Sequence, residues 1–177
     1  AIDECVRNLV CVGADPSRIA ILDNFCWPSC RDARNMGSLV RAAEACLDGA
    51  LAYRVPFISG KDSLKNEYKG KDRRIAIPPT LLISALGQLA DARQAISMDF
   101  KSAGHHIYLV GSSDGAFAGS AYAAIHGLSG GRIPKVNPLA AKVLFARLHK
   151  AIATDLCKAV HDLAEGGVAV AAAEMAL

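Results

Sequence analysis

Strand-like and helix-like patterns alternate along this chain, and that alternation limits the fold more than any other feature. Residues 18–25 form a short apolar run after a turn signal at 15–17, which predicts a strand. Residues 35–54 carry apolar side chains at the 3.6-residue period of an amphipathic helix, and residues 55–59 predict a short buried strand. Because strands and helices are mixed throughout the chain, we expect an α/β or α+β fold.

The remaining patterns predict further elements and a domain boundary. We expect helices at 1–12, 120–126, 139–154 and 167–177, strands at 80–89 and 156–163, and a polar loop or hairpin at 60–70. A polar stretch at 97–105 interrupts the pattern, so we place a boundary near residue 102, between domains at 1–101 and 102–177. The chain begins and ends within helical patterns, which suggests a piece of a longer protein.

Composition excludes several classes of protein. Hydrophobic residues make up 52% and charged residues 21% of the 177 residues, which is a globular balance and argues against disorder or a coiled coil. The net charge of +3 is spread without a basic stripe, so we expect no nucleic-acid partner. No apolar run reaches the roughly 18 residues of a membrane span and no signal peptide is present, so we expect a cytoplasmic protein without a membrane partner. The six cysteines lie mostly in apolar patterns, which indicates buried thiols in a reducing compartment.

Oxygen-bearing side chains in two distant segments are candidate metal ligands. Glu4 and Asn8 stand four apart on the first predicted helix and therefore share one face. Asp162 precedes Gly166 and Gly167, whose backbone N–H groups at a helix start suit a phosphate. Carboxylate and amide oxygens are ligands that Mg²⁺ accepts. The alternatives are a solvated helix face for the first pair and a His-Asp metal dyad of the phosphohydrolase type for the last segment.

A second group of candidates lies near the predicted strands. Asp23 stands at the carboxyl end of an apolar strand, a position from which an acid commonly reaches a ligand. Gly60, Lys61 and Ser63 follow another strand and offer close backbone approach, a positive charge and a hydroxyl to a phosphate. The segment is not a Walker A loop, and a polar turn is the alternative. The glycine-rich stretch 111–119 is either a phosphate-binding loop or a flexible connection.

Five blocks of the chain stand in an order and spacing that characterise one enzyme family. They are L-D-N-F-C-W at 22–27, M-G-S-L-V-R-A-A-E-A-C at 36–46, P-F-I-S-G-K-D-S-L-K-N-E-Y at 56–68, P-P-T-L-L-I-S-A-L-G at 78–87 and H-D-L-A-E-G-G-V-A-V-A-A-A-E-M-A at 161–176. The blocks resemble phosphoribosylformylglycinamidine synthase, also called formylglycinamide ribonucleotide amidotransferase, of the aminoimidazole ribonucleotide synthetase-like superfamily. The resemblance implies part of an N-terminal-like synthetase domain followed by part of a C-terminal-like α/β domain, from the second of the family's two domain pairs.

The resemblance also implies roles for the metal candidates. Glu4 and Asn8 match a Glu-x-x-x-Asn pair that binds Mg²⁺ in larger members, and Asp162 matches the aspartate of a His-Asp motif that binds the same ion. A nucleotide-contacting serine of the family is Ala164 here, so that contact is lost or replaced.

Asp23 and Gly60 match ATP-contacting positions, and Ser63 matches a substrate-contacting serine. Lys61 stands where many small members have a metal-binding asparagine. A charged lysine cannot ligate Mg²⁺, so we expect it to contact phosphate of the bound nucleotide.

The implied function is an ATP- and Mg²⁺-dependent carbon–nitrogen ligase of purine biosynthesis. Such an enzyme converts formylglycinamide ribonucleotide, ATP and glutamine-derived ammonia to the amidine, with the remaining synthetase domains and a glutaminase as partners. No residue here matches a catalytic acid or base of the family. We expect the chain alone to be inactive, because half of each site is missing. The alternatives are a non-catalytic nucleotide-binding half of that enzyme, or another kinase or synthetase of the superfamily.

Overall fold

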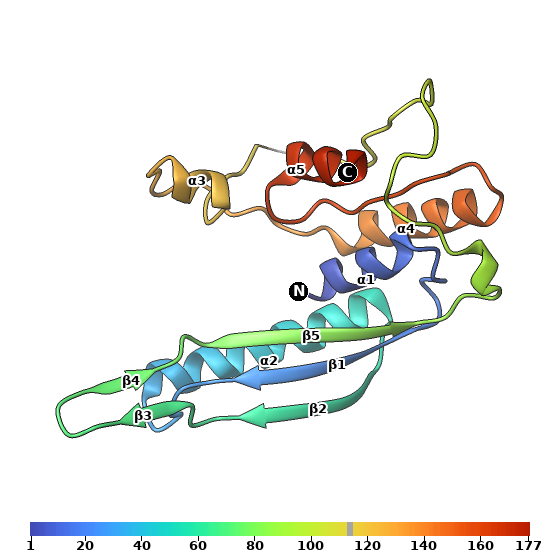
Figure 1. The fold of residues 1–177 in the computed structure, drawn as a ribbon. Helices are drawn as coiled ribbons and strands as arrows, with labels where there is room; N and C mark the ends of the chain where they lie inside the picture. The colour runs from blue at the N-terminus through green and yellow to red at the C-terminus, as the bar shows by residue number, and fades with distance from the viewer. Residues whose placement is uncertain (113–114) are drawn as a thin grey trace. The chain divides into compact units, whose positions relative to one another are not determined.

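The computed structural model describes residues 1–112 and 115–177, which form two compact units (Figure 1). The first unit combines Ala1–Val6 with Ser17–Gln88, and the second combines Arg7–Pro16 with Leu89–Leu177. Helix α1, at Ile2–Cys11, contributes residues to both units. Among the described residues, no helix combines the length and the apolar character needed to cross a membrane.

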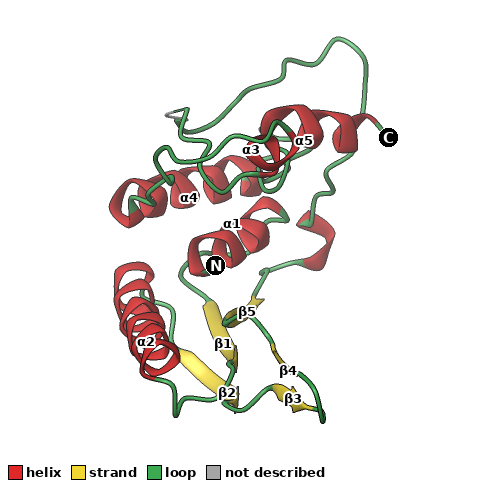
Figure 2. Cartoon of the chain, turned by 90° about the vertical axis from the view of Figure 1, so that its left-hand side faces the viewer, coloured by secondary structure: helices red, strands yellow, loops and turns green. Residues whose placement is uncertain are grey.

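The first unit contains a three-stranded sheet, a long helix and a separate hairpin. The sheet has the order β2-β1-β5, in which β1 pairs parallel with β2 and antiparallel with β5. Helix α2 runs along one face of this sheet, and β3 and β4 form the hairpin (Figures 1 and 2). The elements are β1 at Ile19–Cys26, α2 at Ala33–Tyr53, β2 at Phe57–Ser63, β3 at Glu67–Lys69, β4 at Arg74–Ala76 and β5 at Thr80–Gly87.

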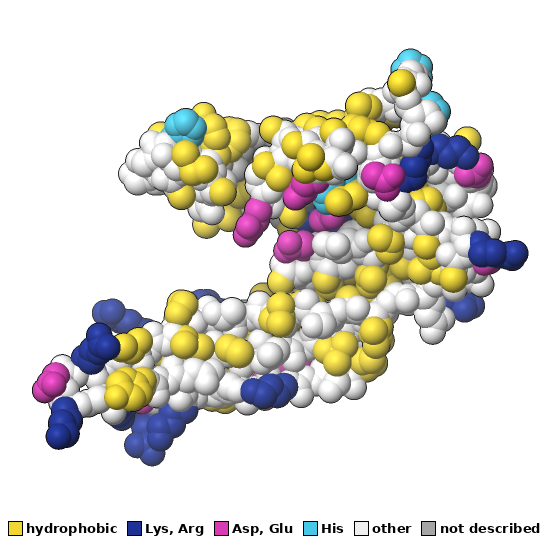
Figure 3. Space-filling model, in the orientation of Figure 1, with side chains coloured by type: hydrophobic (Ala, Val, Ile, Leu, Met, Phe, Trp, Pro, Cys, Tyr) yellow, Lys and Arg dark blue, Asp and Glu magenta, His cyan; other side chains and the backbone are white. Residues whose placement is uncertain are grey.

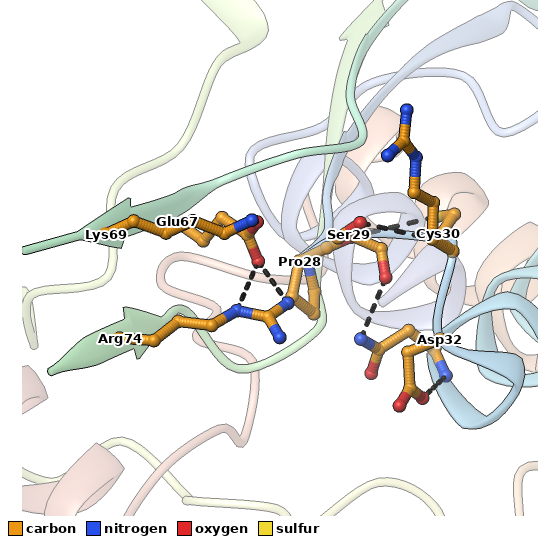
Figure 4. Close-up of polar contacts among 9 residues, drawn as sticks. Pro28, Ser29, Cys30, Asp32, Glu67, Lys69 and Arg74 are labelled. Atoms are coloured by element: carbon orange, nitrogen blue, oxygen red, sulfur yellow. Dashed lines mark hydrogen bonds and ion pairs between the residues drawn. The ribbon is translucent and has the colours of Figure 1, made fainter.

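Local side-chain chemistry fixes the ends of α2. Asp32 is the N-cap, and its carboxylate accepts hydrogen bonds from the backbone N–H groups of Arg34 and Asn35 at 2.9 and 3.1 Å (Figure 4). At the other end, Arg54 adopts a left-handed conformation with φ of 58°, and its N–H bonds the carbonyl of Ala50. The helix therefore begins and ends close to the predicted 35–54.

The core of the first unit lies between the sheet and its helices. Ile21 and Val55 are at most 1% exposed, and Val6 from α1 is 2% exposed. Gly49 of α2 leaves room for Ile2, because a Cβ atom at Gly49 would lie 2.7 Å from the Ile2 side chain. The strand predictions at 18–25 and 80–89 and the helix prediction at 1–12 are confirmed.

Strand β2 corrects the predicted strand at 55–59. It begins two residues later, at Phe57, continues through Gly60 to Ser63, and is mostly exposed rather than buried. The physical reason is its place at the edge of the described sheet, where only β1 lies beside it. The expected loop or hairpin at 60–70 is therefore partly strand, with β3 following at Glu67–Lys69.

The second unit is helical in its described part. Helices α3, α4 and α5 lie at Ala121–Ile125, Pro138–Ala153 and Gly167–Ala176, and a short 3₁₀ turn lies at Ala92–Gln94. These helices confirm the predictions at 120–126, 139–154 and 167–177. The predicted strand at 156–163 is wrong for the described structure: this segment has no strand beside it to share a hydrogen-bond ladder, and its backbone is irregular.

Charged side chains gather over the β3–β4 hairpin. Figure 3 shows Lys and Arg side chains close together on this part of the surface. Glu67 accepts hydrogen bonds from Arg74 and forms an ion pair with Lys69, as Figure 4 shows. Arg74 is the main cause of the lowered pKa of the Glu67 carboxyl. The pair between Glu67 and Arg74 therefore links β3 to β4 across the hairpin.

Candidate functional site

Four of the predicted site residues lie on the neighbouring strands β1 and β2, and we call them the sheet cluster. They are Asp23, Gly60, Lys61 and Ser63. The parallel register places Asp23 opposite Gly60, Asn24 opposite Lys61, and the end of β1 opposite Ser63. Two segments that are separate in the sequence therefore meet in the first unit. Asp23 lies within β1 rather than at its end, which corrects the sequence-based placement.

The strand register divides the sheet cluster between two faces. Side chains alternate along a strand, so Asp23 shares a face with the buried Ile21 and Phe25. Gly60 lies opposite Asp23 and belongs to the same face. Lys61 is one residue further along and belongs to the other face, together with Ser63. The cluster thus offers a carboxylate on one side of the sheet and a charged amine with a hydroxyl on the other.

Gly60 gives the Asp23 carboxylate the space it occupies. A Cβ atom at Gly60 would lie 2.4 Å from Oδ1 and 2.8 Å from Oδ2 of Asp23, well inside van der Waals contact. The backbone at Gly60 is not in the left-handed region, so the need for glycine here is steric rather than conformational.

The Asp23 carboxylate also acts electrostatically on α2. The Cys46 thiol of α2 has a raised pKa, first because it is buried and second because of the negative charge of Asp23. The charge of Asp23 therefore lies close enough to α2 to act on Cys46.

Lys61 and Ser63 contact each other directly, through Nζ and Oγ. The backbone around Ser63 is held by Trp27, whose N–H donates to the Ser63 carbonyl at 2.8 Å. Asn66 then donates its side-chain amide to the same carbonyl at 3.0 Å. These bonds fix the end of β2 and so the position from which Lys61 and Ser63 extend.

The second candidate site, which we call the loop cluster, lies in the second unit and joins α1 to the segment before α5. The amide of Asn8 donates to Oδ2 of Asp162 at 3.4 Å, across 154 residues of sequence. Nε of Arg7 lies 4.0 Å from the same oxygen. Asp162 is only 8% exposed. The structure thus brings together two of the three predicted metal ligands.

His161 and Glu174 complete the loop cluster. Nδ1 of His161 lies 3.4 Å from Oδ1 of Asp162, and Nε2 lies 2.8 Å from Oε2 of Glu174 on α5. The sequence analysis did not select Glu174, because it stands thirteen residues from His161 within an alanine-rich helix. Its spacing from the His-Asp pair carries no local signal, so only the structure reveals the contact.

The negative charge of Asp162 also affects its surroundings. The pKa of the nearby Cys11 thiol is raised to about 12, first by burial and then by the charge of Asp162, with Arg7 acting in the opposite direction. Asp162 therefore lies among groups that are shielded from solvent.

Two predicted phosphate-binding features have different outcomes. The N–H of Gly167 at the start of α5 donates to the carbonyl of Ala164 at 3.2 Å, so it is not free for a phosphate as the sequence suggested. Gly166 has φ of 84°, a conformation that glycine adopts readily. The predicted loop at 111–119 contains residues 113–114 and in that part lies outside the described residues.

Glu4 lies one helical turn before Asn8 on α1. It belongs to the first unit, whereas Asn8 and Asp162 belong to the second. Its role as a third ligand stays a prediction.

Comparison with known proteins identifies the family. Residues 1–89 match the family model described as AIR synthase related protein, N-terminal domain, and residues 102–177 match the corresponding C-terminal domain. The chain belongs to the AIR synthase related proteins. The fold class expected from the sequence, with an N-terminal-type domain followed by a C-terminal-type domain, is confirmed. The position of the boundary between the two stays a prediction.

Curated members of this family with similar sequences are named phosphoribosylformylglycinamidine synthase subunit PurL. The protein from Deinococcus radiodurans is 37% identical over all of this chain, and those from Gloeobacter violaceus and Synechocystis sp. are 35% and 34% identical over 98% and 100% of it. The resemblance found in the sequence is thereby confirmed. This chain spans only 24%, 22% and 23% of the lengths of these relatives.

Proposed function

We propose that the chain is part of the synthetase of a phosphoribosylformylglycinamidine synthase, an ATP-dependent carbon–nitrogen ligase of purine biosynthesis. The observation that best supports a functional site in this chain is the contact between the Asn8 amide and the Asp162 carboxylate, at 3.4 Å. Its partners in this proposal are the remaining synthetase domains and a glutaminase that supplies ammonia. A cytoplasmic location follows from the same assignment.

The proposed reaction has two steps. An amide oxygen of formylglycinamide ribonucleotide attacks the γ-phosphorus of ATP, which releases ADP and leaves an iminophosphate. Ammonia then displaces phosphate, which gives the amidine. Phosphoryl transfer depends mainly on positioning and on neutralising charge, so side chains that hold cations and phosphates are the expected contribution of this chain.

The proposal that the loop cluster binds a hard divalent cation is supported by the surroundings of Asp162, although the described residues contain no group of three or more His, Cys, Asp or Glu side chains placed to hold a metal ion. Asp162 is buried, yet its contacts with Asn8, His161 and Arg7 measure 3.4, 3.4 and 4.0 Å. Charge-assisted hydrogen bonds are usually about 2.7–2.9 Å long, so the carboxylate oxygens retain capacity for a stronger partner. An amide turned through 180° would direct the Asn8 oxygen toward the same place. When bound, Mg²⁺ would neutralise charge on the polyphosphate.

The sheet cluster supports two separate contacts. We assign Asp23 and Gly60 to ATP, as the resemblance implies. Lys61 shares the face of Ser63, which favours a contact with the phosphate of the ribonucleotide rather than with ATP. The strand register is the reason why Asp23 and Gly60 share one face of the sheet and Lys61 and Ser63 the other.

A second candidate is a non-catalytic nucleotide-binding module. Two observations at the start of α5 favour it: Ala164 has no hydroxyl, and its carbonyl already accepts the N–H of Gly167. Nucleotide held at such a site would stabilise the protein without being turned over.

Calorimetric titration of the chain with ADP and Mg²⁺ tests the proposed site. We expect binding to the wild-type chain, and loss or strong weakening in Asp162→Asn and Asn8→Ala. Asp155→Asn is the matched control, because Asp155 lies in the same segment, is 81% exposed and pairs with Lys158. Equal affinity of Asp162→Asn and the wild-type chain would refute the assignment.

Product analysis separates catalysis from scaffolding. The chain supplied with formylglycinamide ribonucleotide, ATP and ammonia should form no amidine, whereas a full-length synthetase that contains this segment should. In the full-length protein, normal turnover but lower stability of Asp162→Asn would favour the non-catalytic module.

A further inference from the structure

We infer that Glu174 is a positioning residue, which sets the orientation of the Asp162 carboxylate by holding the ring of His161. The inference rests on the proposed cation site, because the purpose of an oriented Asp162 is to bind that cation.

Among the described residues, the ring of His161 has two polar contacts, and the one with Glu174 is the shorter. Nε2 of His161 lies 2.8 Å from Oε2 of Glu174, whereas Nδ1 lies 3.4 Å from Oδ1 of Asp162. A carboxylate accepts hydrogen bonds only, so both contacts are hydrogen bonds when each ring nitrogen carries a proton. The short bond at Nε2 limits the rotation of the imidazole ring and therefore the directions in which Nδ1 can point.

The backbone on which Glu174 stands is itself held in place. The N–H of Phe100 donates to the carbonyl of Met175, the next residue along, at 2.8 Å. At the other end of α5, a side chain at Gly166 would collide with Val170, so the helix start is tightly packed. The His161 side chain is 17% exposed, which limits the other orientations open to its ring.

Both carboxylate oxygens of Asp162 have neighbours that limit their orientation. Oδ1 faces the ring that Glu174 holds, and Oδ2 faces Asn8 and Arg7. The carboxylate is therefore confined from two sides. Hydrogen-bonded groups behind a metal ligand commonly change metal affinity by about 10–100-fold when removed. Glu174 acts in this way through His161, without contacting the cation.

Three variants of the chain test this role. Glu174→Ala removes the acceptor at a half-exposed helix position where alanine favours the helix, and Glu174→Gln keeps a neutral acceptor oxygen. Glu165→Ala is the control, because Glu165 is an exposed acid in the same segment. The first readout is the NMR signal of the Asp162 side-chain carboxyl carbon, together with the ring nitrogens of His161. The second is the dissociation constant for Mn²⁺, a paramagnetic probe for the proposed cation, measured by electron paramagnetic resonance.

We expect Glu174→Ala to shift the Asp162 and His161 signals and to weaken Mn²⁺ binding about tenfold. Glu174→Gln should restore most of both properties, and Glu165→Ala should change neither. An Asp162 signal that does not move in Glu174→Ala would overturn the inference, as would unchanged Mn²⁺ affinity. If the wild-type chain binds no Mn²⁺, the proposed cation site fails, while the Asp162 signal still decides whether Glu174 positions this carboxylate.

Discussion

Replacing Gly60 by alanine tests the close packing within the sheet cluster. The added Cβ atom would lie 2.4 Å from Oδ1 and 2.9 Å from Cγ of Asp23. Ordinary contact begins near 3.4 Å, so the carboxylate must move by about 1 Å. Overpacking of this kind typically costs about 1–3 kcal/mol. We expect Gly60→Ala to lower the free energy of unfolding by that amount.

Urea denaturation followed by tryptophan fluorescence measures this loss. Trp27 is the single tryptophan of the chain and lies in the first unit, so its emission reports on the unit that contains Gly60. Gly37→Ala is the matched control. Its added Cβ would meet only the end of the Arg41 side chain, at 3.8 Å, and alanine favours a helix over glycine by about 0.5–1 kcal/mol. The two substitutions should therefore change stability in opposite directions.

A double-mutant cycle isolates the contact with Asp23. In the background of Asp23→Ala the carboxylate is absent, so Gly60→Ala should cost nothing or stabilise the strand. If Gly60→Ala costs the same in both backgrounds, the collision with Asp23 is not the source of the loss and the reasoning is refuted.

Two further predictions concern other parts of the chain. Gly166→Ala should destabilise the second unit by more than the roughly 1–2 kcal/mol of left-handed backbone strain, because its Cβ would lie 2.1 Å from Val170. Gly167→Ala is the control: its φ is 63° but the space around it is open, so it should show the strain alone. Thermal unfolding followed by circular dichroism measures both losses. Hydrogen bonds from Lys101 and Ser97 lower the pKa of Asp99 to about 2, so this interaction stabilises the folded chain above the ordinary carboxyl pKa and is lost as the pH falls through about 2. NMR titration of Asp99 should give that midpoint and a higher one in Lys101→Met; an unchanged midpoint in Lys101→Met would contradict the assigned cause.

Helices were the part of the fold that the sequence predicted well. Their period and their caps are local, so α2 could be placed from its apolar spacing, and the structure adds the Asp32 cap. Strands depend on neighbours that the sequence does not specify. The pattern at 156–163 is as apolar as that at 18–25, but only the latter has partner strands on both sides.

The candidate site shows the same limit. The resemblance selected Asn8 and Asp162, and no local pattern indicates that they meet across 154 residues. The sequence also grouped Gly60 with Lys61, because they are adjacent. The strand register then places them on opposite faces, since a one-residue step reverses the side of a sheet. Glu174 was missed because its partner, His161, is neither close in sequence nor at helical spacing.

Trp27 holds the end of β2 through its backbone, and its own side chain is held by Ser38. Ser38→Ala tests the hydrogen bond between the two side chains. The indole Nε1 donates to Oγ of Ser38 at 2.9 Å, and Trp27 is only 3% exposed. Removing the hydroxyl leaves a buried donor unsatisfied, which typically costs about 1–3 kcal/mol.

We therefore expect a lower urea midpoint for Ser38→Ala in the fluorescence of Trp27. Trp27→Phe combined with Ser38→Ala removes the donor as well, so the added cost of Ser38→Ala should nearly vanish in that background, as measured by circular dichroism. An equal cost in both backgrounds would mean that Ser38 stabilises α2 alone, through its own hydrogen bond to the Asn35 carbonyl. The backbone N–H of Trp27 also donates to the carbonyl of Ser63. Greater mobility of the Trp27 side chain should therefore also increase the mobility of the end of β2, which carries Lys61 and Ser63.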